Sequence, residues 1–123
     1  LLDMMANNYL AWSANLGPAI MGNKDRPELG KELTDSFCQT NEEIARHFAR
    51  VTFLSDNRSD LTKIKVRTLV LQMQQDIIAP NEVGHYVHHA LPNSKLIEME
   101  ATGHCPHVSA PKETIASIKA FIK

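Results

Sequence analysis

The sequence has 123 residues, of which 43% are hydrophobic and 22% charged, and its formal net charge is −1. This length and composition are typical of a single soluble globular domain. The balanced charge argues against nucleic acid or an anionic membrane as a partner, because both attract basic patches. No apolar run approaches the roughly 18 residues that a membrane-spanning helix requires, so we expect no membrane segment.

The cysteines and the first residues lead to two predictions, one about the cellular compartment and one about whether the sequence is a fragment. Cys38 and Cys105 are the two cysteines, and no secretory leader is recognisable, so we expect reduced thiols in a cytoplasmic protein. The chain starts at Leu1, within a helical pattern and without an initiator methionine. We therefore expect a fragment of a longer protein.

The first predicted element is a helix over residues 1–20. Its apolar side chains recur at steps of three and four, which places them on one helical face. Gly17 and Pro18 are expected to end or kink this helix, because proline lacks the amide hydrogen that a helix interior needs. Residues 22–27 are predicted to form a loop.

Two further helices are predicted before residue 55. Pro27 suits a first helical turn, and the helix that it opens runs to about Cys38. Thr40 and Glu43 stand at the spacing of a capping box, which predicts the start of a third helix that ends near Leu54. A short helical turn is expected over residues 59–63.

The second half of the chain changes to a pattern of strand, helix, strand and helix. Residues 66–73 are β-branched and almost continuously apolar, which is typical of a buried strand in a parallel sheet. The pattern then predicts a helix over 81–91, a strand over 94–99, a loop over 101–110 and a last helix over 111–121.

An acid and a histidine each follow one of the predicted strands. Asp76 comes just after the first strand, and His104 comes just after the second. Neighbouring parallel strands end at the same edge of a sheet, so the two side chains are expected to meet there. A carboxylate that binds a histidine fixes its tautomer, and the histidine can then serve as general base to a nucleophile.

The segments around this pair resemble a known subfamily. Residues 71–80 (Leu-Gln-Met-Gln-Gln-Asp-Ile-Ile-Ala-Pro) and 101–111 (Ala-Thr-Gly-His-Cys-Pro-His-Val-Ser-Ala-Pro) are similar to the acid and histidine segments of RsbQ-type α/β-hydrolases and of the plant strigolactone and karrikin receptors. Four motifs of the first half resemble the helical lid of the same subfamily: Asn8-Tyr9-x-x-Trp12, Phe37-Cys38, Ile44-Ala45-Arg46-x-Phe48-Ala49 and Phe53-x-Ser55-Asp56-x-Arg58.

The resemblance implies an α/β fold, the C-terminal part of an α/β-hydrolase. Residues 1–62 would be the helical lid, and residues 63–123 the C-terminal strands and helices of the core. Asp76 would be the acid and His104 the base of a Ser-His-Asp triad, in the chain order of this superfamily. No Gly-x-Ser-x-Gly motif occurs in the sequence, so the chain as given is expected to lack the nucleophile and to be inactive by this mechanism.

The same resemblance implies a ligand and a partner. Trp12, Leu16, Phe48 and Phe53 are the residues expected to line a pocket for a small hydrophobic, ester-like ligand, with no cofactor. An RsbQ-type protein would hydrolyse or sense this ligand and would activate a phosphatase with a PAS sensor domain in a sigma-factor stress response. The alternative is a protein that binds and signals without turnover, or a fragment that self-associates or swaps domains, with the lid as partner surface.

Other histidines and a cysteine are weaker functional candidates. His107 follows His104 closely, but the family pattern makes the first histidine the base and leaves His107 a packing or hydrogen-bonding role. His85, His88 and His89 could form a metal site together with His104 and His107. The first three are expected on a solvated helix face opposite an apolar stripe that begins at Val83, so no metal is expected. Cys105 is an improbable nucleophile, because adjacent side chains point apart.

Overall fold

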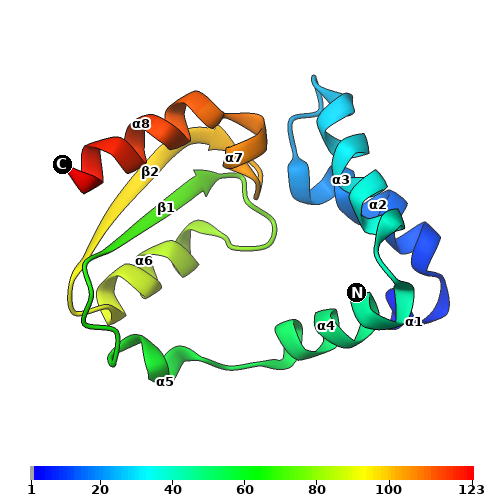
Figure 1. Cartoon of the computed structure of the whole chain (residues 1–123), viewed down its shortest axis with the longest axis horizontal. Coiled ribbons are helices and arrows are strands. Elements are labelled where there is room, and N and C mark those ends of the chain that lie inside the picture. Colours follow the sequence, from blue (N-terminus) through cyan, green and yellow to red (C-terminus); the bar gives the residue numbers. More distant parts are fainter. Residues whose placement is uncertain (1) are drawn as a thin grey trace. The chain divides into compact units, whose positions relative to one another are not determined.

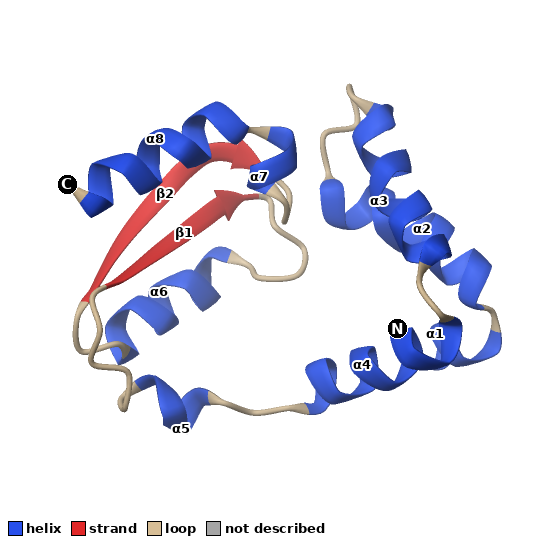
Figure 2. Ribbon diagram, viewed as in Figure 1, coloured by secondary structure: helices blue, strands red, loops and turns tan. Residues whose placement is uncertain are grey.

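The computed structural model describes residues 2–123, which form two compact units. The first, here called the helical unit, comprises Leu1–Asp56, and the second, the strand unit, comprises Asn57–Lys123. Helices make up the first unit, and the second combines helices with two strands (Figure 2). The chain is therefore an α/β protein, as the sequence predicted, while the division into a lid and a core stays a prediction.

The helical unit buries one face of its first helices. Its elements are α1 (Leu2–Asn7), α2 (Tyr9–Met21), α3 (Pro27–Gln39) and α4 (Glu42–Leu54) (Figure 1). The periodic apolar residues of the sequence form the core of this unit, which consists of Met5, Tyr9, Trp12 and Leu16 together with Ala49 of α4. The expected apolar face is confirmed, although two helices carry it instead of one.

The predicted helix divides at Asn8, and its second part, α2, continues through Gly17 and Pro18, so the end expected at these two residues was wrong, while a kink there stays a prediction. The Asn8 side chain accepts a hydrogen bond from the Ala11 amide and caps α2. A Cβ on Gly17 would lie 2.3 Å from Oγ1 of Thr34 in α3. Gly17 therefore allows α2 and α3 to approach closely, and it does not end α2.

The cap of α4 also differs from the prediction. The Asn41 side chain accepts a hydrogen bond from the Ile44 amide at 3.1 Å, whereas the Thr40 hydroxyl donates to the Ser36 carbonyl at 3.1 Å. Asn41 is therefore the N-cap, and the predicted capping box of Thr40 and Glu43 was wrong. The Thr40 hydroxyl binds a carbonyl at the end of α3, and the following residue, Asn41, caps α4.

The strand unit is a two-stranded parallel sheet with helices on both faces. Its elements are α5 (Arg58–Leu61), β1 (Thr68–Gln74), α6 (Asn81–Ala90), β2 (Ser94–Thr102), α7 (Pro106–Ser109) and α8 (Pro111–Ile122). β1 pairs with β2 in parallel, and α6 and α8 lie on opposite faces of the sheet (Figure 1). Met73, Met99 and Ala101 form its buried core.

Three features of this unit differ from the sequence-based expectations. β2 runs three residues past its predicted end because it contains a bulge, and the expected loop over 101–110 contains the short helix α7. The apolar stripe of α6 was partly misplaced, since Val83 is exposed whereas Gly84 is buried against β1. A glycine signals no burial in a hydrophobic pattern, which explains the error.

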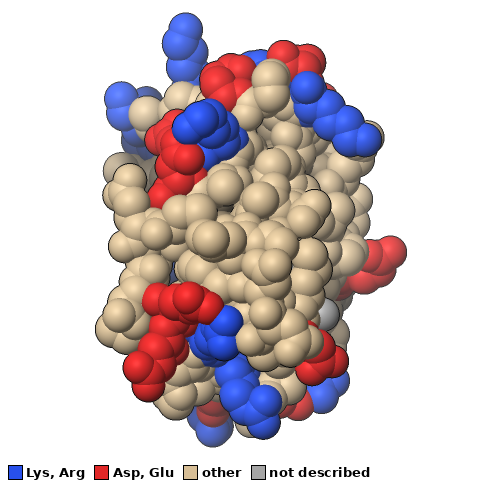
Figure 3. Space-filling model, turned by 90° about the vertical axis from the view of Figure 1, so that its right-hand side faces the viewer, with Lys and Arg blue, Asp and Glu red and all other residues tan. Residues whose placement is uncertain are grey.

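Charged side chains of both signs occur on the surface. On the face drawn in Figure 3, Lys and Arg side chains lie among Asp and Glu side chains around a central area of other residues. Over residues 2–123, no helix is both long enough and apolar enough to cross a membrane.

Candidate active site

The acid and the histidine occupy equivalent places, two residues beyond the ends of the paired strands. Gln75 follows β1 with a φ of 49°, and Gly103 follows β2 with a φ of 81°. Each left-handed residue turns the chain sharply before Asp76 or His104. Glycine adopts this conformation freely, whereas it costs a glutamine on the order of 1 kcal/mol, so the turn before Asp76 carries local strain.

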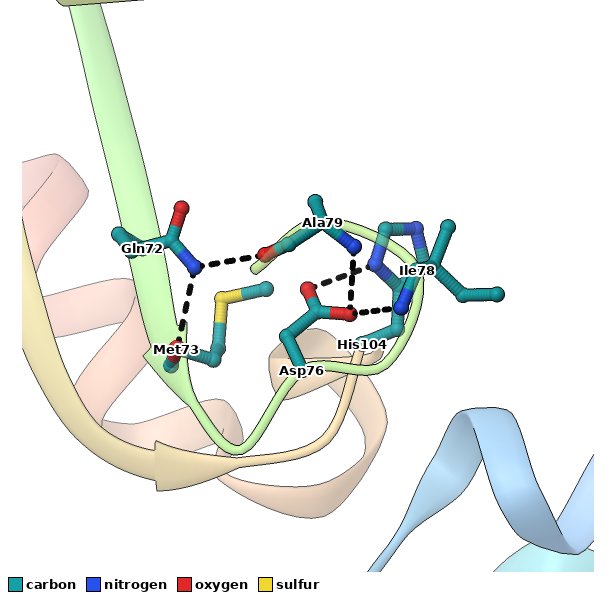
Figure 4. A network of polar contacts seen from close by, with 6 residues as sticks. All are labelled: Gln72, Met73, Asp76, Ile78, Ala79 and His104. Carbon is teal, nitrogen blue, oxygen red and sulfur yellow. Dashed lines mark hydrogen bonds and ion pairs between the residues drawn. The ribbon is translucent and has the colours of Figure 1, made fainter. Parts of the chain in front are cut away.

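Asp76 and His104 are hydrogen-bonded to each other. His104 Nδ1 lies 2.8 Å from Asp76 Oδ2 (Figure 4). The Asp76 side chain is fully buried, whereas the His104 side chain is 38% exposed. An ionised carboxylate only accepts, so Nδ1 carries the proton, and in the neutral ring Nε2 is left as the acceptor. The arrangement presents a basic nitrogen whose ring orientation is fixed by a buried carboxylate.

The second oxygen of Asp76 holds its own loop. Oδ1 accepts hydrogen bonds from the backbone amides of Ile78 at 2.9 Å and Ala79 at 3.0 Å. The buried carboxylate therefore has three donors, which compensate for the cost of removing it from water. Figure 4 shows one carboxylate oxygen bound to His104 and the other bound to these two amides.

Gln72 is a buried polar residue of β1 that the sequence analysis missed. Its Nε2 donates to the carbonyls of Met73 at 3.0 Å and Ala79 at 2.9 Å, which ties the far end of the Asp76 loop to the strand. A Cβ on Gly84 would lie 2.2 Å from Gln72 Oε1, so a glycine in α6 makes room for this side chain. The only sequence signal was a glutamine in an apolar strand.

The other histidines do not take part in the hydrogen bond between Asp76 and His104. His107 lies exposed in α7 rather than packed. His85 Nε2 lies 2.9 Å from Glu98 Oε1 in a second, exposed acid–histidine pair, and His88 Nδ1 lies 2.7 Å from Ser94 Oγ. His85 and His88 thus reach side chains of β2, whereas His89 Nδ1 lies 2.7 Å from the His85 carbonyl of its own helix. Among residues 2–123, no three side chains form a cluster that could hold a metal ion.

Cys105 is poorly suited to act as a nucleophile. Partial burial, and secondly the negative charge of Asp76, raise the pKa of its thiol. A raised pKa lowers the thiolate fraction near neutral pH, and the thiolate is the reactive form. Its place beside His104 in the loop is therefore no sign that Cys105 is a nucleophile.

The four residues expected to contact a ligand line one cavity within the helical unit. The cavity has a volume of about 330 Å³, and its wall includes Trp12, Leu16, Phe48 and Phe53. Tyr9 stacks on Trp12 with ring centroids 5.5 Å apart, which makes part of the wall rigid. Most of the lining is apolar, as in sites for small hydrophobic molecules.

The structure thus brings the predicted site residues together in two groups. Asp76 and His104 meet in the strand unit, while the four cavity residues meet in the helical unit. Chemically, the first group can accept a proton at Nε2 of His104 and stabilise the resulting imidazolium through Asp76. The second group offers an apolar surface to a ligand of modest size, on which Trp12 and Leu16 are buried and Phe48 and Phe53 are exposed.

Comparison with known proteins identifies relatives for most of the chain. The model of a family described as TAP-like protein, whose members are α/β-hydrolases, matches residues 38–122. The chain is 30% identical to a probable esterase of Oryza sativa subsp. japonica, over 100% of its own length and 46% of that protein. It is also 30% identical to a strigolactone esterase of Arabidopsis thaliana, over 89% of its own length and 41% of that protein.

Solved structures agree with this assignment. The hydrolase olei00960 from Oleispira antarctica matches with a TM-score of 0.93 and 38% sequence identity, over 98% of this chain and 44% of that one. A bromoperoxidase from Bacillus anthracis matches with a TM-score of 0.87 at 21% identity, which supports the fold alone. The chain spans less than half the length of these relatives.

Proposed function

The chain belongs to the TAP-like protein family of α/β-hydrolases, and from this premise we propose that it supplies the acid and the base of a serine hydrolase. The observation that carries the proposal is the 2.8 Å hydrogen bond between His104 Nδ1 and the buried carboxylate of Asp76. In a triad, such a bond leaves the second ring nitrogen available to take the proton of a serine.

The proposed reaction follows from this placement. A serine Oγ attacks the carbonyl carbon of an ester while its proton passes to Nε2 of His104. The imidazolium, stabilised by Asp76, then returns that proton to the departing alkoxide, and an acyl-serine remains. Water attacks the acyl group with His104 again as base, which releases the carboxylic acid and restores the serine.

The nucleophile has to come from outside these 123 residues. The sequence contains no Gly-x-Ser-x-Gly motif, which is the usual setting of the serine in this superfamily. The relatives are more than twice as long as the chain. We use the term complete hydrolase for a protein in which residues 1–123 are joined to the half of the fold that bears the nucleophile and the oxyanion hole.

The proposed substrate is a small, apolar, ester-like molecule. An apolar cavity of about 330 Å³ with an aromatic wall favours such a ligand over a charged or extended one. Relatives at similar identity carry the names strigolactone esterase and probable esterase, in agreement with an ester. The cavity would act as the ligand pocket of the complete hydrolase.

The cavity can be tested with Phe48→Ala in the complete hydrolase and a series of p-nitrophenyl esters of increasing chain length. Losing an aromatic contact is worth about 1.5 kcal/mol, so KM should rise about tenfold while kcat changes little. Val51→Ala is the matched control, because Val51 is an exposed residue of the same helix outside the cavity wall. Equal KM values for both variants would remove Phe48 from the binding site.

Ligand sensing is the second candidate, because several relatives carry the name karrikin insensitive 2 receptor. A protein of the RsbQ type would couple the bound ligand to a phosphatase with a PAS domain and act in the cytoplasm as a positive regulator of a stress sigma factor. The ester series separates the two roles. Tight binding with negligible turnover, together with capture of such a phosphatase, would favour the receptor role over the esterase role.

Self-association is proposed for the chain in isolation. Each strand of the two-stranded sheet has one edge without a strand partner among residues 2–123, and exposed strand edges pair readily with other chains. Phe48 and Leu54 of α4 and Ile122 of α8 are also exposed. Light scattering of the 123-residue chain should show dimers or larger species, and a monomer that unfolds cooperatively would contradict the proposal.

A further inference from the structure

A bulge in β2 precedes the histidine. Gln72 pairs with Glu98 and Gln74 pairs with Thr102, so three residues of β2 lie opposite Met73 alone. Bulges of this kind re-aim the chain beside functional sites, but they leave backbone amides that the partner strand does not use. After Thr102, the amide of Gly103 again binds the partner strand and donates to the Gln74 carbonyl at 3.1 Å.

The amides of the bulge are bound by one carboxylate. Glu113 Oε1 accepts from the amide of Glu100 at 2.7 Å, and its Oε2 accepts from the amide of Ala101 at 3.1 Å. Hydrogen bonds to an ionised acceptor are about twice as strong as neutral ones, and here both oxygens are used. Glu113 lies in the first turn of α8, where the helix dipole also favours a negative charge.

These two bonds close the loop that carries His104. The loop leaves β2 after Thr102 and enters α8 at Pro111, so Glu113 joins the last residues of β2, just before the loop, to the first turn of α8, just after it. The interior of the loop is already tied, because the amides of Val108 and Ser109 both donate to the Cys105 carbonyl at 3.0 Å. Glu113 is thus a polar link between this compact loop and the sheet.

We propose that Glu113 is a positioning residue: its carboxylate fixes the β2 bulge and thereby holds His104 in hydrogen-bonding register with Asp76. The proposal rests on the proposed function for its catalytic consequence, but the placement of His104 can be measured without turnover. If the bulge loosens, Gly103 and His104 shift along the end of β2, and the bond between Nδ1 and the Asp76 carboxylate weakens. A misplacement of about 1 Å can cost a factor on the order of 100 in rate.

The test uses Glu113→Gln in the complete hydrolase, because glutamine has the same shape but offers one acceptor where the bulge presents two donors. Glu82→Gln is the matched control, since it removes a carboxylate from the first turn of α6. We expect kcat to fall roughly 10- to 100-fold with KM within about twofold of the parent protein. The control should keep the kcat of the parent.

Nuclear magnetic resonance provides the readout that is independent of turnover. The 15N shifts of the His104 ring should report protonation at Nδ1 in the parent and a mixture of tautomers in Glu113→Gln, with faster amide hydrogen exchange at Gly103. Parent-like ring shifts and exchange in a folded variant would overturn the proposal, and so would a fall in kcat explained entirely by loss of folded protein. Absence of turnover in the parent would refute the proposed function and leave this readout decisive for Glu113.

Discussion

Replacement of His104 by alanine should lower kcat of the complete hydrolase by roughly 10⁶-fold, because the serine would lose its general base. The protein should still fold. The His104 side chain is partly exposed, and the Asp76 carboxylate keeps its hydrogen bonds from the amides of Ile78 and Ala79. The measurement is the turnover of a p-nitrophenyl ester, with the free energy of unfolding followed in parallel.

Two controls match this substitution. His85→Ala removes a histidine that also binds a carboxylate, at 2.9 Å, in an exposed pair on α6 and β2. His107→Ala removes the neighbouring histidine of the same loop. Both variants should retain the kcat of the parent within a few fold, and esterase activity that survives His104→Ala would show that the base lies elsewhere.

Asp76→Asn should lower kcat about 10⁴-fold and leave KM nearly unchanged. The amide oxygen can still accept from the backbone amides of Ile78 and Ala79, while the amide nitrogen now faces Nδ1 of His104. The ring would then be held with its proton on Nε2, so it could not accept the proton of the serine. Glu98→Gln, in the exposed pair with His85, is the matched control and should have parent-like kcat.

The same variant has a second consequence that requires no substrate. The charge of Asp76 contributes to the raised pKa of the Cys105 thiol, after burial. Removing that charge lowers the pKa, so the thiolate fraction at about pH 8 rises and alkylation of Cys105 should be faster in Asp76→Asn than in the parent. An unchanged alkylation rate would mean that the carboxylate does not act on this thiol.

The sequence determined much of the strand unit and of the candidate site. β1 was predicted from its continuous apolar, β-branched run and β2 from its alternating pattern, and the positions of Asp76 and His104 follow from the rule that parallel strands end at one edge. The α/β-hydrolase fold is confirmed by the family match and by structures that cover 98% of the chain. These features depend on residues that are close together in the sequence, so they can be predicted from a single sequence.

Tertiary structure decided the features that depend on distant neighbours. Gly17 looked like a helix breaker until α3 was seen to pack against it, and Val83 looked buried although Gly84 is the residue that faces Gln72. The partners of Glu113 also lie on another element, at amides freed by a bulge that no local pattern announces. The sequence by itself therefore determined that Asp76 and His104 follow neighbouring strands, and their part in the chemistry stays a prediction. The supports that hold Asp76 and His104 in place became visible only in three dimensions, because hydrogen-bond partners and close approaches are set by the packing of separate elements.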